Sequence, residues 1–176
     1  MNLEARFIRC NLYDLQEHLE AKFDIVFCSY GAIGWLHDLG KWANLISHYL
    51  KAGGFFYIVD AHPTAMIFNN DHTGEISVKY PYSTGVNPLL FDEDGSYADP
   101  EAKLANKTEY GWNHPLGVIV NSLVNSGLKI EFLNEHYRVP WQMFRMLEKN
   151  ETGWWGFPNS WSTREFPLLF SLKASK

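Results

Sequence analysis

The stretch that decides the fold is "YLKAGGFFYIVDAHP", residues 49–63. Over 39–50, a segment that ends within the first residues of this stretch, apolar residues recur with helical spacing, which predicts a helix with one buried face. A glycine pair at 53 and 54 then makes a turn, and "FFYIVDA" (55–61) is an apolar run typical of a buried strand. A similar run, "FDIVFCSY" (23–30), precedes the helix and is typical of a strand buried on both faces. Strand, helix and strand in this order predict a right-handed parallel crossover.

Composition limits the class of protein. A chain of 176 residues suits one globular domain. Its net charge is −5 and it has no basic run, which argues against nucleic acid as the main partner. No apolar run is long enough to span a membrane, and the first ten residues lack the pattern of a secretory signal. Cys10 and Cys28 have no disulfide spacing and are predicted to be reduced thiols. We therefore expect a cytoplasmic protein without a membrane partner.

The remaining segments extend this order of elements. "ARFIRC" (5–10) predicts a short strand, followed by a brief helical piece near 16–20. After the crossover, helical spacing resumes over 116–124, between Pro115 and Gly127, which suit the start and end of a helix. Two strands, 128–139 and 166–175, follow it. Because an irregular, aromatic-rich excursion joins these two strands, we expect them to form an antiparallel closing pair.

Residues 64–113 interrupt the pattern. This segment contains Pro, Gly, Asn and Asp throughout, with one hairpin predicted around "EISVKYPY" (75–82). It is far longer than an ordinary connection, and long insertions of this kind often form lids. Its "VKYPY" and "EYGWNH" clusters favour an ordered lid. Simple coverage of the sheet edge is the alternative.

The segment "FDIVFCSYGAIGWLHDLGKWANLISHYLKAGGFFYIVDAHP" (23–63) resembles the middle of class I S-adenosylmethionine-dependent methyltransferases. "FIRCNLYDL" (7–15) is similar to the strand and loop just before it in that family, and "PLLFSLKAS" (167–175) is similar to its last strand. The resemblance covers essentially the whole chain, 1–176, as a single partial methyltransferase domain. It implies an α/β fold with a Rossmann-like, mostly parallel sheet and an antiparallel last strand, with 64–113 as an insertion.

One part of that family's pattern has no counterpart here. Nucleotide cofactor sites of this kind begin with a strand leading into a Gly-rich turn, followed by a strand with an acidic end. The resemblance starts at the family's third strand, so we expect an N-terminally truncated domain. The two absent strands would lie between 5–10 and 23–30. Their absence would leave a gap or force those two strands to pair, and an exposed sheet edge would favour a homo-oligomer.

The resemblance implies S-adenosylmethionine as the cofactor and places residues around it. Asn11 would bind the adenine amine and Leu12 would pack beside it, although Asn11 could equally cap a turn. Ser29 and Tyr30, at the end of 23–30, would lie near the methyl donor, or serve as a turn former and a packing aromatic. Trp35 would face the sulfonium and the acceptor, because aromatic faces attract cations, or else lie in the core.

Aromatic side chains from two later segments are candidates for the acceptor site. The insertion's clusters "VKYPY" (78–82, which ends at Tyr82) and "EYGWNH" (109–114) would wall an apolar or cationic pocket for a small-molecule substrate, together with Trp154, Trp155 and Phe157. His62 would act as general base on the acceptor, or be a loop histidine bonded to backbone. Asp60 likewise would act at the acceptor site, or be a strand-end carboxylate that accepts hydrogen bonds from backbone N–H groups.

Histidines are scattered along the chain, and the adjacent Asp71 and His72 would face apart in an extended segment, so no metal site is predicted.

The sequence leaves two functions open. The first is S-adenosylmethionine-dependent methyl transfer to a small-molecule acceptor, with this chain as the C-terminal two-thirds of the catalytic domain. The second is a non-catalytic remnant of the methyltransferase fold that acts as an oligomerising interaction module.

Overall fold

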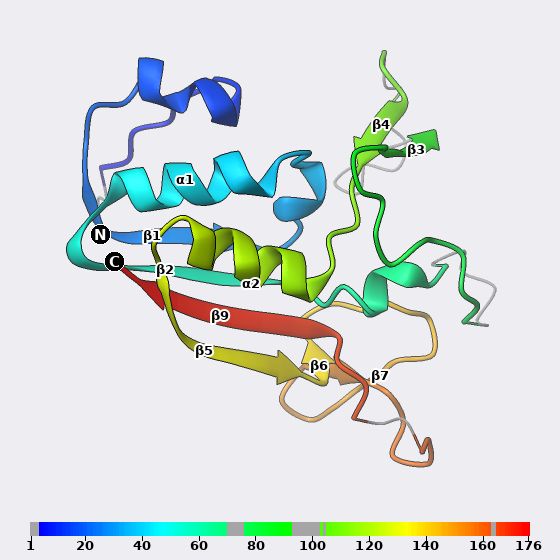
Figure 1. Cartoon of the computed structure of the whole chain (residues 1–176). Helices are drawn as coiled ribbons and strands as arrows, with labels where there is room; N and C mark the ends of the chain where they lie inside the picture. The colour runs from blue at the N-terminus through cyan, green and yellow to red at the C-terminus, as the bar shows by residue number, and fades with distance from the viewer. Residues whose placement is uncertain (1–3, 70–75, 93–102, 104, 163–164) are drawn as a thin grey trace.

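The predicted crossover forms the centre of the fold. In the computed structural model, which describes residues 4–69, 76–92, 103, 105–162 and 165–176, strand β1 (Phe23–Ser29) leads through helix α1 (Leu39–Tyr49) into strand β2 (Leu50–Ala61). The two strands pair in parallel, with Phe27 opposite Tyr57. This confirms the prediction made from 23–63. It also brings the carboxyl ends of both strands to one edge of the sheet (Figure 1).

The closing antiparallel pair is confirmed as well. Strand β9 (Leu169–Ser175) lies between β2 and β5 (Lys129–His136) and runs antiparallel to both. The strand order of this sheet is β1-β2-β9-β5. Among the described strands the sheet is therefore mixed, with one parallel pair and an antiparallel last strand inserted between its neighbours.

Both long helices pack on one face of the sheet (Figure 1). Helix α2 (Leu116–Asn125) ends where Gly127 adopts a φ of 84°, a left-handed conformation that favours glycine. The core between helices and sheet is apolar, and fully buried Phe56, Ile58, Leu123, Phe170 and Leu172 are among its members. Of the helices that the structure describes, none combines the length and apolarity that crossing a bilayer requires.

The first segment differs from the prediction. No strand forms over 5–10, and the helical piece is a 3-10 helix, η1 (Leu12–Glu17), that starts earlier than expected. Phe7 is 94% exposed. Of the two alternatives, a gap or a pairing of 5–10 with β1, the pairing does not form, because the chain instead runs beside α1. It is held there by Tyr13, whose hydroxyl accepts from Asp38 N, and by Tyr49, whose hydroxyl donates to Leu19 O.

The prediction that 23–30 is buried on both faces is wrong. Val26 and Cys28 pack into the core, whereas the alternate residues Ile25 and Phe27 are 55% and 59% exposed. The reason is that the helices cover only one face, and the described residues leave β1 at the edge of the sheet. An apolar strand sequence does not by itself reveal whether both of its faces have partners.

The described part of the long insertion contains a 3-10 helix and a pair of short strands. The 3-10 helix η3 (Ala65–Ile67) follows β2, and strands β3 (Leu89–Asp92) and β4 (Thr108–Gly111) form an antiparallel hairpin. The hairpin predicted around 75–82 does not form over its described part, where Val78 makes a bridge with Phe68 instead. Residue 75 lies outside the described residues.

A small three-stranded sheet follows β5. Its strands are β6 (Arg138–Val139), β7 (Glu148–Lys149) and β8 (Trp155–Gly156), in the order β6-β8-β7. A separate apolar cluster lies beneath it and includes Val139, Leu147 and Phe157. The aromatic-rich excursion before β9 thus packs into a second core, which it shares with Ala65 of η3 and Leu169 of β9.

Candidate functional site

The loop after β1 is shaped by one carboxylate at the end of β2. Asp60 is 2% exposed, and its Oδ1 accepts from the backbone N–H of Gly31 (2.6 Å) and Ala61 (2.7 Å). Its Oδ2 accepts from Ala32 N (3.2 Å) and Ile33 N (3.4 Å). Gly31 has a φ of 80°, which allows the chain to turn sharply over the carboxylate. Asp60 therefore has the second of the two roles considered for it, that of a strand-end carboxylate bonded to backbone donors.

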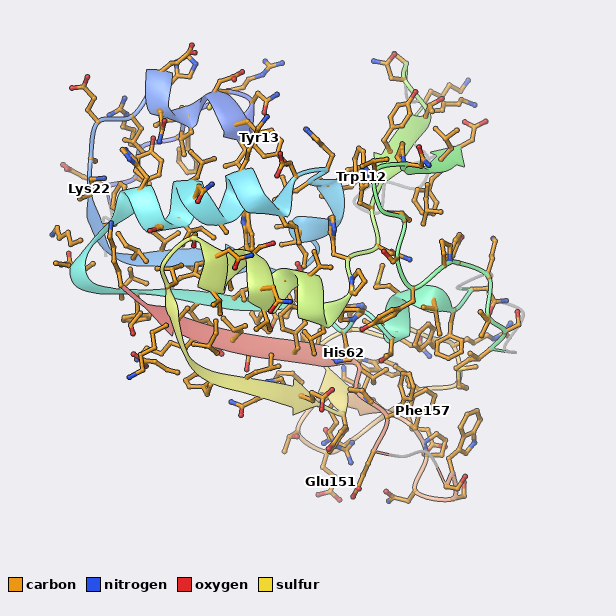
Figure 2. All side chains as sticks on the ribbon, in the orientation of Figure 1. Tyr13, Lys22, His62, Trp112, Glu151 and Phe157 are labelled. Atoms are coloured by element: carbon orange, nitrogen blue, oxygen red, sulfur yellow. The ribbon has the colours of Figure 1, made fainter. Side chains whose placement is uncertain are left out.

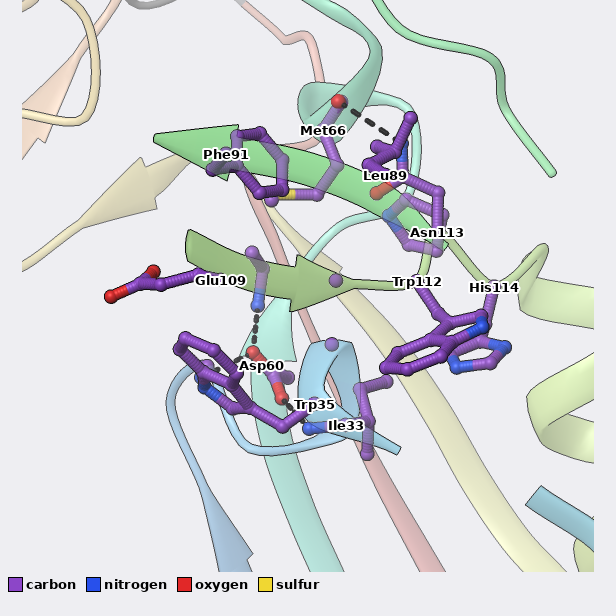
Figure 3. A pocket seen from close by; sticks show the side chains of 15 residues that line it. Ile33, Trp35, Asp60, Met66, Leu89, Phe91, Glu109, Trp112, Asn113 and His114 are labelled. Carbon is purple, nitrogen blue, oxygen red and sulfur yellow. Dashed lines mark hydrogen bonds between the residues drawn. The ribbon is translucent and has the colours of Figure 1, made fainter. Parts of the chain in front are cut away.

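A cavity of about 330 Å³ opens above this loop. Its floor is the loop after β1 and the end of β2, and the β3–β4 hairpin with the residues after it forms the opposite wall (Figure 3). The lining is mostly apolar, with three aromatic rings and two carboxylates. These are Trp35, Phe91, Trp112, Asp60 and Glu109.

Three hydrogen bonds fix the hairpin side of the cavity. Trp112 N donates to Gly34 O (2.8 Å), which joins the end of β4 directly to the loop after β1. His114 Nε2 donates to Leu36 O (2.7 Å), and burial lowers the pKa of His114 although nearby backbone carbonyls oppose this effect. Asn113, which is buried, donates from Nδ2 to Pro81 O (2.8 Å). Segments from three parts of the chain are thereby held around one space.

His62, the predicted general base, does not line this cavity. It is 3% exposed, and Figure 2 shows it near the ends of β9 and β5, apart from Trp112. Its Nδ1 lies 2.7 Å from Thr64 Oγ1 and 3.2 Å from Thr64 N, which donates to it. Nε2 lies 2.9 Å from Glu135 Oε1, out of line for a regular hydrogen bond. Burial lowers the pKa of His62, and the charge of Glu135 opposes that shift. The role of general base stays a prediction.

The predicted cofactor residues lie in different places. Leu12 and Ser29 line a largely apolar groove of about 470 Å³ between η1, β1 and α1, and Trp35 lies at its boundary with the cavity. Asn11 caps η1, its Oδ1 accepting from Tyr13 N (3.0 Å). In the same groove, burial together with the charge of Asp60 raises the pKa of Cys28 to about 12, so its thiol stays protonated.

Tyr30 faces away from that groove. Its ring meets Trp141 edge-on with the centroids 5.4 Å apart, and it shares a second groove, of about 610 Å³, with Trp154. Trp155 packs instead into the small apolar cluster, where Lys149 Nζ lies 5.7 Å from its ring centroid. Tyr82 accepts from Leu116 N through its hydroxyl (3.3 Å). Of the four predicted substrate residues, only Trp35 lines the cavity.

Several cavity residues were not identified from the sequence. The cluster "EYGWNH" (109–114) was predicted to help wall an acceptor pocket, but Glu109 and Trp112 were not named individually as site residues, and Phe91 was not singled out. Within the described part of the chain, no three His, Cys, Asp or Glu side chains are grouped so as to hold a metal ion. Asp71 and His72 lie outside the described residues.

Comparison with known proteins bears on the fold. No protein-family model matches the chain, and no curated protein matches it significantly. Among solved structures, it is similar to an S-adenosylmethionine dependent methyltransferase from Mesorhizobium loti, with a TM-score of 0.54 and 17% identity over 90% of this chain. It is also similar to an S-adenosylmethionine-dependent methyltransferase from Clostridium acetobutylicum ATCC 824, with a TM-score of 0.54 and 13% identity over 98% of this chain.

The chain therefore has the fold of class I S-adenosylmethionine-dependent methyltransferases, as its resemblance to that family implied. It spans 63% and 65% of the two solved chains, which is less than two thirds of their length.

Proposed function

We propose that this protein takes part in methyl transfer from S-adenosylmethionine to a small-molecule acceptor, and that the acceptor occupies the cavity between the loop after β1 and the β3–β4 hairpin. The observation that carries this proposal is the position of the cavity. It lies at the carboxyl ends of the parallel strands β1 and β2, the edge at which open α/β sheets bind ligands. The solved structures that share the fold support the choice of cofactor.

Methyl transfer from a sulfonium is an in-line displacement, so the protein mainly orients the two reactants and excludes water. In this chain, Asp60 fixes the loop beneath the acceptor, and the hydrogen bond from Trp112 N to Gly34 O holds the hairpin over it. We do not assign the proton transfer to His62. Its ring would have to leave Thr64 and Glu135 before it could turn to the cavity.

The cofactor itself fits the adjacent groove in part. Leu12 would contact the adenine, whose flat apolar faces match the apolar lining. The described lining of the groove contains no charged side chain for the ammonium and carboxylate groups of the cofactor. The proposal therefore assigns only the adenine end to this groove.

The test is the release of S-adenosylhomocysteine from S-adenosylmethionine in the presence of small-molecule acceptors. It should be run on the 176-residue chain and on the protein isolated from its native cells. A matched pair of variants comes from one strand, because Phe91 lines the cavity whereas its neighbour Leu90 is 66% exposed and does not. Phe91→Ala should lower turnover at limiting acceptor, and Leu90→Ala should not. No release from either preparation with any acceptor would refute the proposal.

One observation favours the second function, an oligomerising interaction module. Within the described residues, β1 is paired only with β2, and Ile25 and Phe27 are exposed on its outer face. An unpaired apolar edge is a template for association with another chain. We propose self-association through this edge as the alternative. Light scattering that finds a monomer at all accessible concentrations would contradict it.

A further inference from the structure

The lining of the cavity distinguishes among classes of acceptor, and we propose that the acceptor is an amine that becomes a substituted ammonium ion. This inference rests on the proposed function, because it takes the cavity as the acceptor site. It names the atom that receives the methyl group, nitrogen, which the fold alone leaves open. Two properties of the cavity support it: its charge and its aromatic walls.

The charge of the lining is negative. Asp60 and Glu109 contribute carboxylates, and no Lys or Arg is among the described residues that line the cavity. His114 also lines it, but burial keeps that ring neutral near physiological pH. A carboxylate or phosphate acceptor would therefore meet like charges with no cation to offset them. An ammonium group would meet opposite charges instead.

Aromatic rings surround the same space. In the view of Figure 3, Trp35 and Trp112 lie on either side of Asp60, and Phe91 lies above it on β3. The electron-rich faces of such rings attract cations, and cages of several rings are a recurrent site for quaternary ammonium groups. Glu109 extends from β4 away from Trp112 in Figure 3, so its carboxylate lies toward the outer side of the cavity and that of Asp60 at its floor.

The chemistry of amine methylation matches this environment. The nitrogen lone pair forms the new N–C bond while the C–S bond breaks, and the electrons of that bond return to sulfur. The positive charge thus moves from the sulfonium to the nitrogen, leaving a neutral thioether. Carboxylates and aromatic faces aimed at the nitrogen stabilise the charge that develops there. In its neutral form a tertiary amine loses no proton during the transfer itself, so that step needs no general base; the protonated amine would first give its proton to water or to the carboxylate of Glu109.

A matched pair of probes tests the charge preference directly. Choline and 3,3-dimethylbutan-1-ol have the same shape and differ in carrying a quaternary nitrogen or a quaternary carbon. Binding is measured by calorimetry and by the NMR signals of the indole N–H groups of Trp35 and Trp112. We expect choline to bind the protein at least about tenfold more tightly than the alcohol, a difference of about 1.4 kcal/mol. Equal affinities, or no binding of choline at millimolar concentrations, would overturn the inference.

Variants locate the preference within the cavity. Glu109→Gln should weaken choline binding several-fold and leave binding of the neutral alcohol unchanged. Glu148→Gln is the matched control, because Glu148 is an exposed residue of β7 outside the cavity lining. If Glu109→Gln weakens both probes equally, the effect is one of shape, and the charge argument fails.

Neither probe requires S-adenosylmethionine, so the two proposals can fail separately. Preferential choline binding without any release of S-adenosylhomocysteine would leave the cation site standing and refute methyl transfer. Turnover with neutral alcohols, together with equal binding of the two probes, would support methyl transfer and refute the amine acceptor.

Discussion

Replacing Asp60 by Asn tests how the floor of the cavity is built. In the native structure both carboxylate oxygens accept backbone N–H groups, two at each oxygen. The amide of Asn has one acceptor oxygen and one NH₂ group. If its oxygen replaces Oδ1, the short bonds from Gly31 and Ala61 remain. The NH₂ group then faces the N–H groups of Ala32 and Ile33, which lose their acceptor.

The expected cost follows from these contacts. A hydrogen bond to a charged group contributes roughly 1.5–3 kcal/mol, and an unsatisfied buried donor costs about 1–3 kcal/mol. The two bonds that are lost are the longer ones, 3.2 and 3.4 Å, so we take the lower end for each. Asp60→Asn should therefore reduce the free energy of unfolding by about 2–4 kcal/mol.

Urea unfolding at neutral pH, followed by tryptophan fluorescence, measures this loss. The matched control is Asp24→Asn, because Asp24 lies on the neighbouring strand with its side chain 80% exposed in a surface ion pair with Lys51. Such pairs contribute little, so the control should unfold nearly as the native protein does. If both variants unfold at the same urea concentration, the four hydrogen bonds do not stabilise the loop and the reasoning is wrong.

Three further predictions use other parts of the fold. Burial holds the pKa values of His62 and His114 below their ordinary value of 6.5, so the unfolded chain takes up protons first as the pH falls. The free energy of unfolding should therefore not change through these two groups above pH 6.5 and should fall below it. A His62→Gln, His114→Gln double variant should show a shallower fall in urea titrations at several pH values. Gly54→Ala should destabilise by ~1–3 kcal/mol, because a Cβ there would lie 2.9 Å from the backbone oxygen of Asp24, whereas Gly117→Ala on open helix surface should not destabilise; chemical unfolding compares the two. Phe27→Glu should abolish any self-association seen by light scattering, and persistence of the same oligomer would exclude the β1 edge as its interface.

The sequence was sufficient for elements whose partners lie nearby in the chain. The crossover 23–61 was predictable because helical spacing and two apolar runs follow one another within a short segment. The closing strands were predictable from their length and position. The structure of 5–10 was not predicted correctly, since β-forming residues produce a strand only where a neighbouring strand offers a hydrogen-bonded edge. Among the described residues no strand pairs with Phe7 and its neighbours, although β1 has an unpaired edge.

The cavity was less predictable because its residues come from distant segments. Along β4, Glu109 lines the cavity and Tyr110 does not, as expected for alternating side chains. A shift of one residue in the β3–β4 register would exchange their positions, and nothing in 108–111 alone fixes that register. Trp112 is held at the site by its backbone hydrogen bond to Gly34, and His114 by its hydrogen bond to Leu36. The second of these bonds joins residues 78 positions apart in the chain. Contacts over such spans leave no local periodic signal.

The two proposed functions use different surfaces of the sheet, which bears on how they relate. Along β2, Phe56, Ile58 and Asp60 are buried on the helix side, and Asp60 carries the loop that forms the floor of the cavity. Ile25 and Phe27 of β1 alternate with core residues and so face the opposite side. A chain that paired with the β1 edge and covered Phe27 would therefore not need to enter the cavity. Association and acceptor binding are then compatible in one molecule, and Phe27→Glu should separate them by removing the first while leaving choline binding intact.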